Sequence, residues 1–300
     1  MKSTKSFARI ASTLLCLTVF AAASFAKNHP LNQPSGLAVA SNGDLYVANE
    51  GGNEILVYAP SYSQIAGKTI TQGINSPTAV AFDPQGNLWV GNLIQSETQD
   101  EYLSEYSSAG KQINPAISVS NFETFYPTLA VDGVGDAWIL GVYKGQDCVF
   151  AVNAPNAYPT GLIDTLYIQT GNYTAVAARG PWVAFGTLTN ASWELTGAVL
   201  TNYTQGYFGS SVSEPSGVVA VTFDANFMLY VAAQNGFGDT GIQFIDVPAG
   251  GSPDNRITLS YVPSGMAADS VHQRLYVANS NNTQIQVYST TTFQLLTTIQ

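Results

Sequence analysis

Asparagine stands at the end of three short apolar segments of this 300-residue chain, at Asn49, Asn92 and Asn279. Each lies three residues after an aromatic residue, so the three occupy one position of a repeated pattern. A carboxamide offers both donors and an acceptor, which suits it to orient a sugar or to coordinate a hard cation. Together with the neighbouring Glu50, these side chains are predicted to form part of a ligand site. The alternative is that each asparagine only stabilises a turn.

A hydroxyl residue marks a second position of the pattern, in a residue pair that begins 9 to 15 residues before each aromatic. The six hydroxyl residues are Ser35, Thr78, Thr128, Thr174, Ser216 and Ser264. A ring of hydroxyls could line a wet central channel, and Ser35, Thr78 and Ser264 would then belong to the ligand site. The alternative is that each hydroxyl bonds the local backbone where the chain turns inward.

Acidic residues gather in one segment after Asn92, at Glu97, Asp100, Glu101 and Glu105. They lack the glycine-punctuated spacing of a dedicated calcium loop, so the expectation is a solvated loop. Asp83-Pro84-Gln85-Gly86 has the residue types of a type I turn and is predicted to lie on the opposite face. No cofactor is therefore predicted, although calcium is left open.

Histidine and cysteine are scarce, which limits nucleophilic and general-base chemistry. His29 lies near the N-terminus and His272 in a predicted turn, and neither is expected at the mouth of a channel. A histidine-based triad is therefore not the expected chemistry. Cys148 is predicted to be an inert thiol, and no intrachain disulfide is expected.

The elements that must position these side chains are short β-strands in a repeated unit. Residues 34–60 hold three apolar runs separated by Ser-Asn-Gly-Asp and Asn-Glu-Gly-Gly-Asn, which predicts an antiparallel meander, with Lys68–Thr71 as a fourth strand. Pairs of an aromatic and a β-branched residue recur at Tyr46-Val47, Trp89-Val90, Trp138-Ile139, Trp182-Val183, Tyr230-Val231 and Tyr276-Val277. Their spacings of 43, 49, 44, 48 and 46 residues predict an all-β fold, a six-bladed β-propeller of four-stranded antiparallel blades.

The blades are sandwiched between neighbours in such a fold, so the aromatics are predicted to be buried wedges. The three asparagines then fall on one face in consecutive blades, as a polar arc opposite Gly141, Phe185 and Ala233. Because the chain ends on a predicted outer strand at Leu295–Ile299, the ring is expected to close by packing. Pairing of Asn28–Leu31 with the last blade stays open as an alternative.

The runs PSGLAVASNGDLYVAN, residues 34–49, and PSGMAAD…RLYVAN, residues 263–279, resemble NHL repeats, whose families form six-bladed propellers. The resemblance implies the fold but no particular function, because such propellers serve as scaffolds, binding modules and enzymes alike. Virginiamycin B lyase-like propellers, which these repeats also resemble, rely on a histidine for which no match is visible here. Gluconolactonase-like propellers place a carboxylate and asparagines around a divalent metal, and that carboxylate would fall at Ser35.

The first residues have the pattern of a secretory signal peptide. Lys2, Lys5 and Arg9 precede an apolar run, residues 10–23, and Ser24-Phe25-Ala26 supplies a cleavage site after Ala26. The run is shorter than a membrane span requires. Residues 1–26 are thus predicted to be a leader, and residues 27–300 a single propeller domain without a membrane span.

Removal of the leader lowers the number of Lys and Arg residues from 10 to 7, against 20 Asp and Glu residues. So acidic a chain is not expected to bind nucleic acid. The sequence predicts a bacterial, periplasmic or extracellular monomer, a non-enzymatic binding or scaffold propeller for a small polar ligand, a glycan or a protein. The alternative is a metal-assisted hydrolase or lyase of the gluconolactonase-like type.

Overall fold

The computed structural model describes residues 28–92, 102–118, 124–133, 135–143, 146–153, 163–166, 173–180, 182–187, 192–195, 208–211, 217–234, 240–246, 254–279, 281 and 283–300. The helices found in these residues are single 3₁₀ turns, η1 (Glu50–Gly52) and η2 (Ala66–Lys68), and the other regular elements are β-strands. The predicted leader and the acidic residues Glu97, Asp100 and Glu101 lie outside the described residues. A search of the described part finds no helix long and apolar enough to cross a membrane.

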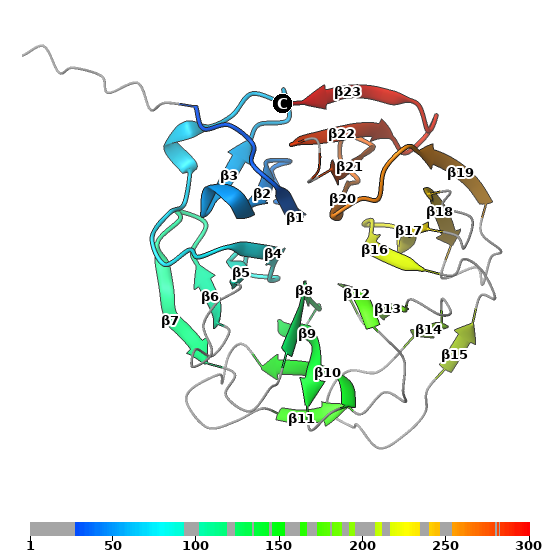
Figure 1. The fold of residues 1–300 in the computed structure, drawn as a ribbon, viewed down its shortest axis with the longest axis horizontal. Coiled ribbons are helices and arrows are strands. Elements are labelled where there is room, and N and C mark those ends of the chain that lie inside the picture. Colours follow the sequence, from blue (N-terminus) through cyan, green and yellow to red (C-terminus); the bar gives the residue numbers. More distant parts are fainter. Residues whose placement is uncertain are drawn as a thin grey trace, which may run out of the picture.

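The strands form blades arranged around a central axis, as Figure 1 shows, and this confirms the predicted β-propeller. Blade 1 holds β1 (Pro34–Val39), β2 (Leu45–Asn49) and β3 (Glu54–Tyr58). Blade 2 holds β4 (Pro77–Phe82), β5 (Leu88–Asn92), β6 (Tyr102–Tyr106) and β7 (Gln112–Ser118). Blade 3 holds β8 (Thr124–Val131), β9 (Asp136–Tyr143), β10 (Gln146–Asn153) and β11 (Ile163–Leu166).

Blade 4 is built from two separate strand pairs, β12 (Tyr173–Arg179) with β13 (Trp182–Thr187) and β14 (Ser192–Leu195) with β15 (Phe208–Ser211). Blade 5 holds β16 (Val218–Phe223), β17 (Met228–Gln234), β18 (Thr240–Asp246) and β19 (Asp254–Leu259). Blade 6 holds β20 (Gly265–Asp269), β21 (Arg274–Asn279), β22 (Gln284–Ser289) and β23 (Leu295–Ile299). Within each sheet consecutive strands pair antiparallel, and the first strand of each blade lies nearest the axis (Figure 1).

The turns between first and second strands form as their residue types predict. In blade 2, Gly86 N–H donates to the Asp83 carbonyl at 3.0 Å, and Gly86 has a φ of 84°. The Asp83 carboxylate accepts the Asn87 N–H at 2.7 Å, which closes the turn and explains why this aspartate is buried. The predicted turn is therefore confirmed.

The predicted fourth strand of blade 1 is wrong in extent. Of the predicted strand Lys68–Thr71 only Ile70 pairs with β3, through a single bridge to Ile55, because the preceding Ala66–Lys68 forms η2; before η2, Gln64 forms a separate bridge to Tyr58. The chain also turns just beyond, at Gly73, whose φ of 73° an extended strand does not allow. Two turns so close together leave Ile70 as the one residue of Lys68–Thr71 that pairs with β3.

The core lies between blades rather than within them. Six clusters of buried apolar side chains, all drawn from the described residues, each join one pair of neighbouring blades, including blade 6 with blade 1. Trp89 is 0% and Trp138 1% exposed, which confirms the predicted wedges in blades 2 and 3, whereas Trp182 of blade 4 is only partly buried. Trp138 also donates its indole N–H to Asp132 Oδ2 at 3.0 Å and meets Phe185 of blade 4 edge-on.

The ring closes by packing, as predicted. Blade 6 has four consecutive strands of its own, and residues 28–33 form no strand with them. Instead, Leu31 packs in the same cluster as Ile299 at the junction of blades 6 and 1. The innermost strands meet so closely there that a Cβ on Gly265 would lie 2.1 Å from the carbonyl oxygen of Ser35. Glycine is therefore needed at that position.

Candidate functional site

The ends of the second strands lie beside the starts of the first strands, as the predicted meander requires. Pro34 pairs with Asn49 in blade 1, and Pro77 pairs with Asn92 in blade 2. We call this end of the propeller the top face, and the end with the first turns the bottom face. Asn279 ends β21 of blade 6 in the same way, so all three predicted asparagines lie on the top face.

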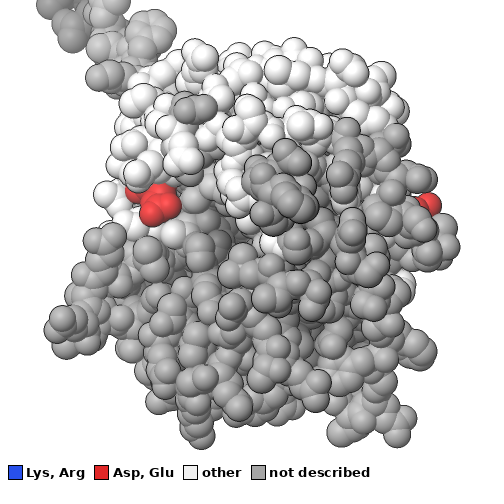
Figure 2. All heavy atoms as spheres, turned by 45° about the vertical axis from the view of Figure 1, so that its right-hand side comes forward, with Lys and Arg blue, Asp and Glu red and all other residues white. Residues whose placement is uncertain are grey.

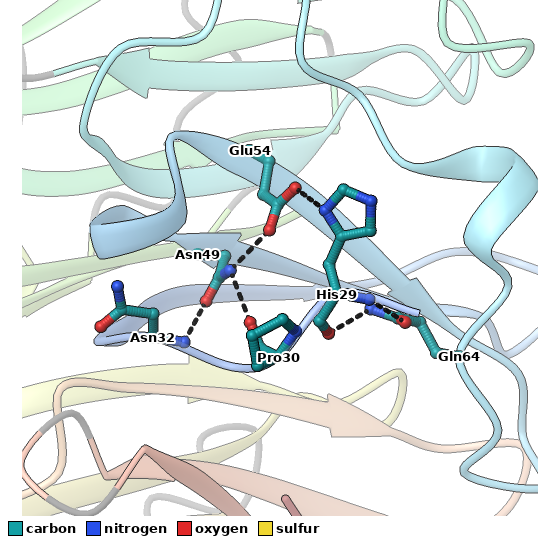
Figure 3. Close-up of polar contacts among 6 residues, drawn as sticks. All are labelled: His29, Pro30, Asn32, Asn49, Glu54 and Gln64. Carbon is teal, nitrogen blue, oxygen red and sulfur yellow. Dashed lines mark hydrogen bonds and ion pairs between the residues drawn. The ribbon is translucent and has the colours of Figure 1, made fainter. Parts of the chain in front are cut away.

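Asn49 is fully buried, and its amide holds the segment that leads into blade 1 (Figure 3). Its Oδ1 accepts the Asn32 N–H at 2.6 Å. Its Nδ2 donates to the Pro30 carbonyl at 3.1 Å and to Glu54 Oε1 at 2.9 Å. These bonds make Asn49 a positioning residue for the N-terminal segment, by which we mean residues 28–33.

Asn92 repeats this arrangement in blade 2. Its Oδ1 accepts the Asn75 N–H at 3.0 Å, and its Nδ2 donates to Ser104 Oγ at 3.2 Å. Asn92 and Asn279 are both buried. The polar arc therefore lies beneath the top face, where Asn49 and Asn92 fix the segments above them. Contact of these amides with a ligand stays a prediction.

The apolar side of the predicted arc also lies inside the protein. Phe185 and Ala233 are both buried in clusters between blades, which leaves them almost no exposed surface. The side chain of Cys148, in β10, lies outside the described part of the chain. At the end of the second strand, the asparagines of blades 6, 1 and 2 and the apolar residues of blades 4 and 5 are thus all buried. The difference between them reflects how each blade packs.

The predicted hydroxyl ring links neighbouring blades. Ser35 Oγ lies 3.3 Å from the Ala48 carbonyl of its own blade and 3.1 Å from the Pro77 carbonyl of blade 2. Ser264 Oγ donates to the Pro34 carbonyl at 2.6 Å, across the junction of blades 6 and 1. The alternative that each hydroxyl bonds its local backbone therefore holds only in part, because the innermost strands are close enough for a short side chain to reach the next blade as well.

Other blades use the same device. Thr174 Oγ1 donates to the Val218 carbonyl of blade 5, and Thr128 Oγ1 accepts the Val176 N–H of blade 4 at 3.0 Å. Thr78 Oγ1 approaches a carbonyl of its own blade, that of Gly91, at 3.5 Å. Ser216 lies outside the described residues. These hydroxyls are engaged with backbone groups around the axis.

Exposed amides lie on the top face just above the buried ones. Asn32, Gln33, Asn53 and Asn75 are exposed, and Glu50 is half-buried among them. Gly51 N–H donates to the Asn32 carbonyl at 3.0 Å, and Asn53 Oδ1 accepts the Ser76 N–H at 2.7 Å. These bonds join three segments of blades 1 and 2 into one surface, which we call the amide surface (Asn32, Gln33, Glu50, Asn53, Asn75).

The side chains Glu54 and His29 form a carboxylate–imidazole pair next to Asn49 (Figure 3). His29 Nδ1 lies 2.6 Å from Glu54 Oε2, and Gln64 bonds both the main-chain N–H and the carbonyl of His29. Sequence reasoning did not identify Glu54, because nothing in its local pattern shows that the N-terminal segment covers it. A buried carboxylate of this kind orients the imidazole and leaves Nε2 available.

The predicted acidic loop needs one correction. Glu105 lies in β6, where it is buried and accepts the Asn87 Nδ2–H at 3.0 Å, so it is part of the sheet. Its place in the strand follows from pairing of Glu105 with Trp89. Within the described ranges, no group of three His, Cys, Asp or Glu side chains is placed to hold a metal ion.

The bottom face carries a second carboxylate–imidazole pair, in the turn where His272 was predicted. His272 Nδ1 lies 2.7 Å from Asp269 Oδ2, and Asp269 Oδ1 accepts the His272 N–H at 3.0 Å. Asp136, near the bottom of blade 3, is also buried. Burial and the neighbouring Asp132 raise the pKa of Asp136 from 3.8 to about 6.

Comparison with known proteins agrees with this architecture. Residues 31–58, which span the three strands of blade 1, match the NHL repeat family. The chain is a β-propeller that carries an NHL repeat. No curated protein matches it in sequence. Among solved structures, this propeller is similar to hydrazine synthase of Kuenenia stuttgartiensis, with a TM-score of 0.58 and 14% identity over 87% of this chain and 84% of that one.

Two lyases have the same fold. The propeller is similar to virginiamycin B lyase from Staphylococcus aureus, with a TM-score of 0.55 and 12% identity over 89% of this chain and 84% of that one. A streptogramin B lyase structure gives a TM-score of 0.58 and 14% identity over 92% and 85% of the two chains. At such identities the likeness establishes the fold alone, because unrelated functions share this scaffold.

Proposed function

We propose that this protein is an exported, non-enzymatic binding propeller whose ligand docks on the top face of blades 6, 1 and 2. The ligand class is a small polar molecule, a glycan or a protein segment. The observation that carries the proposal is the amide surface, where exposed carboxamides sit on segments held rigid from below by Asn49 and Asn92. A rigid row of donors and acceptors recognises hydroxyls or peptide groups at a low entropic cost.

Charge supports the choice of ligand. On the face that Figure 2 shows, the charged side chains visible on the described surface are carboxylates. Glu50 adds a carboxylate within the amide surface, and burial raises its pKa. The formal net charge of the whole chain is −10. Neutral or cationic ligands therefore fit this surface, whereas nucleic acid would be repelled.

Export is part of the proposal and rests on the sequence. Cleavage after Ala26 would release residues 27–300 as one propeller domain to the periplasm or the medium. Of the asparagines predicted as ligand residues, Asn49 and Asn92 then position the surface from below, and the exposed amides make the contacts. A monomer presents this surface without help from a second chain.

The experiment is a screen of glycans, peptides and cations, followed by substitution at the amide surface. Asn32→Ala and Asn75→Ala should each weaken binding by about 1 kcal/mol, because a ligand group loses its partner. Both residues hold their place through main-chain bonds to Asn49 and Asn92, so their side chains can be removed without loss of those bonds. Asn226→Ala, an exposed amide on the bottom face, is the matched control.

Two results would contradict the proposal. The first is unchanged affinity in both variants for a ligand that the wild-type protein binds. The second is turnover, for example calcium-dependent opening of a lactone that is lost in Asn49→Ala. That result would favour the alternative of a metal-assisted hydrolase or lyase.

A further inference from the structure

The N-terminal segment includes a histidine whose ring and main chain are both held by blade 1. His29 Nδ1 lies 2.6 Å from Glu54 Oε2, and its main-chain N–H donates to Gln64 Oε1 at 2.8 Å (Figure 3). We call these two bonds the latch. The Glu54 side chain is 6% exposed, whereas that of His29 is 42% exposed. Solute therefore reaches the imidazole, although its partner is buried.

Cleavage after Ala26 would create a new chain terminus two residues before His29. The mature chain then begins Lys27-Asn28-His29, with a free α-amine on Lys27 and a main-chain N–H on both Asn28 and His29. A histidine in third place allows the α-amine, those two main-chain nitrogens and Nδ1 to close fused chelate rings around one ion. Nitrogen donors in a square plane suit Cu(II) best and Ni(II) next.

We propose that the mature N-terminus is a Cu(II) site made of the Lys27 α-amine, the main-chain nitrogens of Asn28 and His29, and His29 Nδ1. This rests on the cleavage included in the proposed function. Both main-chain nitrogens lose their protons to solvent when the complex forms, so binding strengthens as the pH rises. Pro30, which has no N–H, follows the last ligand and does not interrupt the set.

Copper and blade 1 compete for the same two atoms of His29. A metal-bound main-chain nitrogen has no proton to donate to Gln64, and a metal-bound Nδ1 cannot also bond Glu54. Copper binding therefore opens the latch, while Asn49 still holds Pro30 and Asn32. By linkage, the latch lowers the copper affinity by the same factor by which copper weakens the latch. The site couples a metal ion to release of the chain terminus.

The test uses the exported protein, with its N-terminus read by intact-mass spectrometry. Cu(II) is titrated against a competing ligand such as free glycine, and the complex is followed by visible absorption and electron paramagnetic resonance. We expect about one equivalent per chain with the spectrum of a planar four-nitrogen site. Glu54→Gln should tighten binding by about tenfold without changing the spectrum, because a charged competitor for Nδ1 is lost. Glu105→Gln, at a buried glutamate of blade 2, should leave the affinity unchanged.

A second variant keeps the test independent of folding. Insertion of one alanine after Lys27 moves His29 to fourth place while leaving Glu54, Gln64 and His29 intact, so the planar spectrum should disappear. A terminus other than Lys27 would overturn the cleavage and the copper site together. A Lys27 terminus without this complex would overturn the copper site alone. Equal affinities in wild type and Glu54→Gln would overturn the competition with the latch.

Discussion

Replacing Asn49 by alanine tests whether this buried amide holds the N-terminal segment on blade 1. The side chain accepts the Asn32 N–H at 2.6 Å and donates to the Pro30 carbonyl at 3.1 Å and to Glu54 Oε1 at 2.9 Å. In Asn49→Ala all three groups lose this partner. The segment should then detach from blade 1 more readily, and the whole fold should be less stable.

The structure sets the size of the effect. The bonds to Asn32 and Pro30 join neutral groups at part-buried positions and contribute about 0.5–1.5 kcal/mol each. The bond to the buried carboxylate of Glu54 contributes about 1.5–3 kcal/mol, because a charged acceptor is left short of a donor. We expect Asn49→Ala to lower the free energy of unfolding by about 3 kcal/mol, since such contributions are not fully additive.

Asn92→Ala is the matched comparison. Asn92 makes only neutral bonds among those described, to the Asn75 N–H and to Ser104 Oγ, so its loss should cost about 1.5 kcal/mol. Both free energies follow from urea unfolding of residues 27–300, read at equal slopes. Equal losses in the two variants, or less than about 1 kcal/mol for Asn49→Ala, would refute the argument that the charge on Glu54 makes blade 1 the more sensitive of the two.

Three further predictions concern the ring. Trp138→Ala should cost about 3–5 kcal/mol in urea unfolding, because it leaves a cavity between blades and removes the bond to Asp132; an unchanged midpoint would mean that the wedge is not needed. Ser264→Ala should cost about 1 kcal/mol, since the Pro34 carbonyl loses its donor at the junction of blades 6 and 1; no loss would show that water replaces the hydroxyl. Asp136→Asn should stabilise the protein at pH 8 by up to about 3 kcal/mol. The raised pKa of Asp136 means that the folded state binds its proton more tightly, so wild-type stability falls as pH rises between 3.8 and about 6. The gain should therefore shrink in unfolding measurements made at pH 5, and a gain equal at both pH values would point to another cause.

The sequence by itself determined the architecture, because the residue types that mark strands and turns recur in every blade of a propeller. Aromatic pairs such as Trp89-Val90 mark the second strands, and they are buried as expected. Turns such as the one at Asp83 and Gly86 follow from residue types within a few positions of one another. The face that carries the three asparagines also followed, since antiparallel pairing fixes which strand ends lie together.

Only the tertiary structure decided what those side chains touch. Ser264 bonds Pro34 from the far end of the chain, and Glu54 is covered by His29 from a segment that the sequence left open as a strand of the last blade. A repeated pattern shows how many residues each blade contains but not how far apart neighbouring blades lie. That distance determines whether a hydroxyl bonds the backbone of its own blade or that of the next blade. The same holds for Asn49 and Asn92, whose amides are indistinguishable from surface amides until the chain above them is in place. Burial is a property of the assembled ring, so the exposed surface could be found only from the fold.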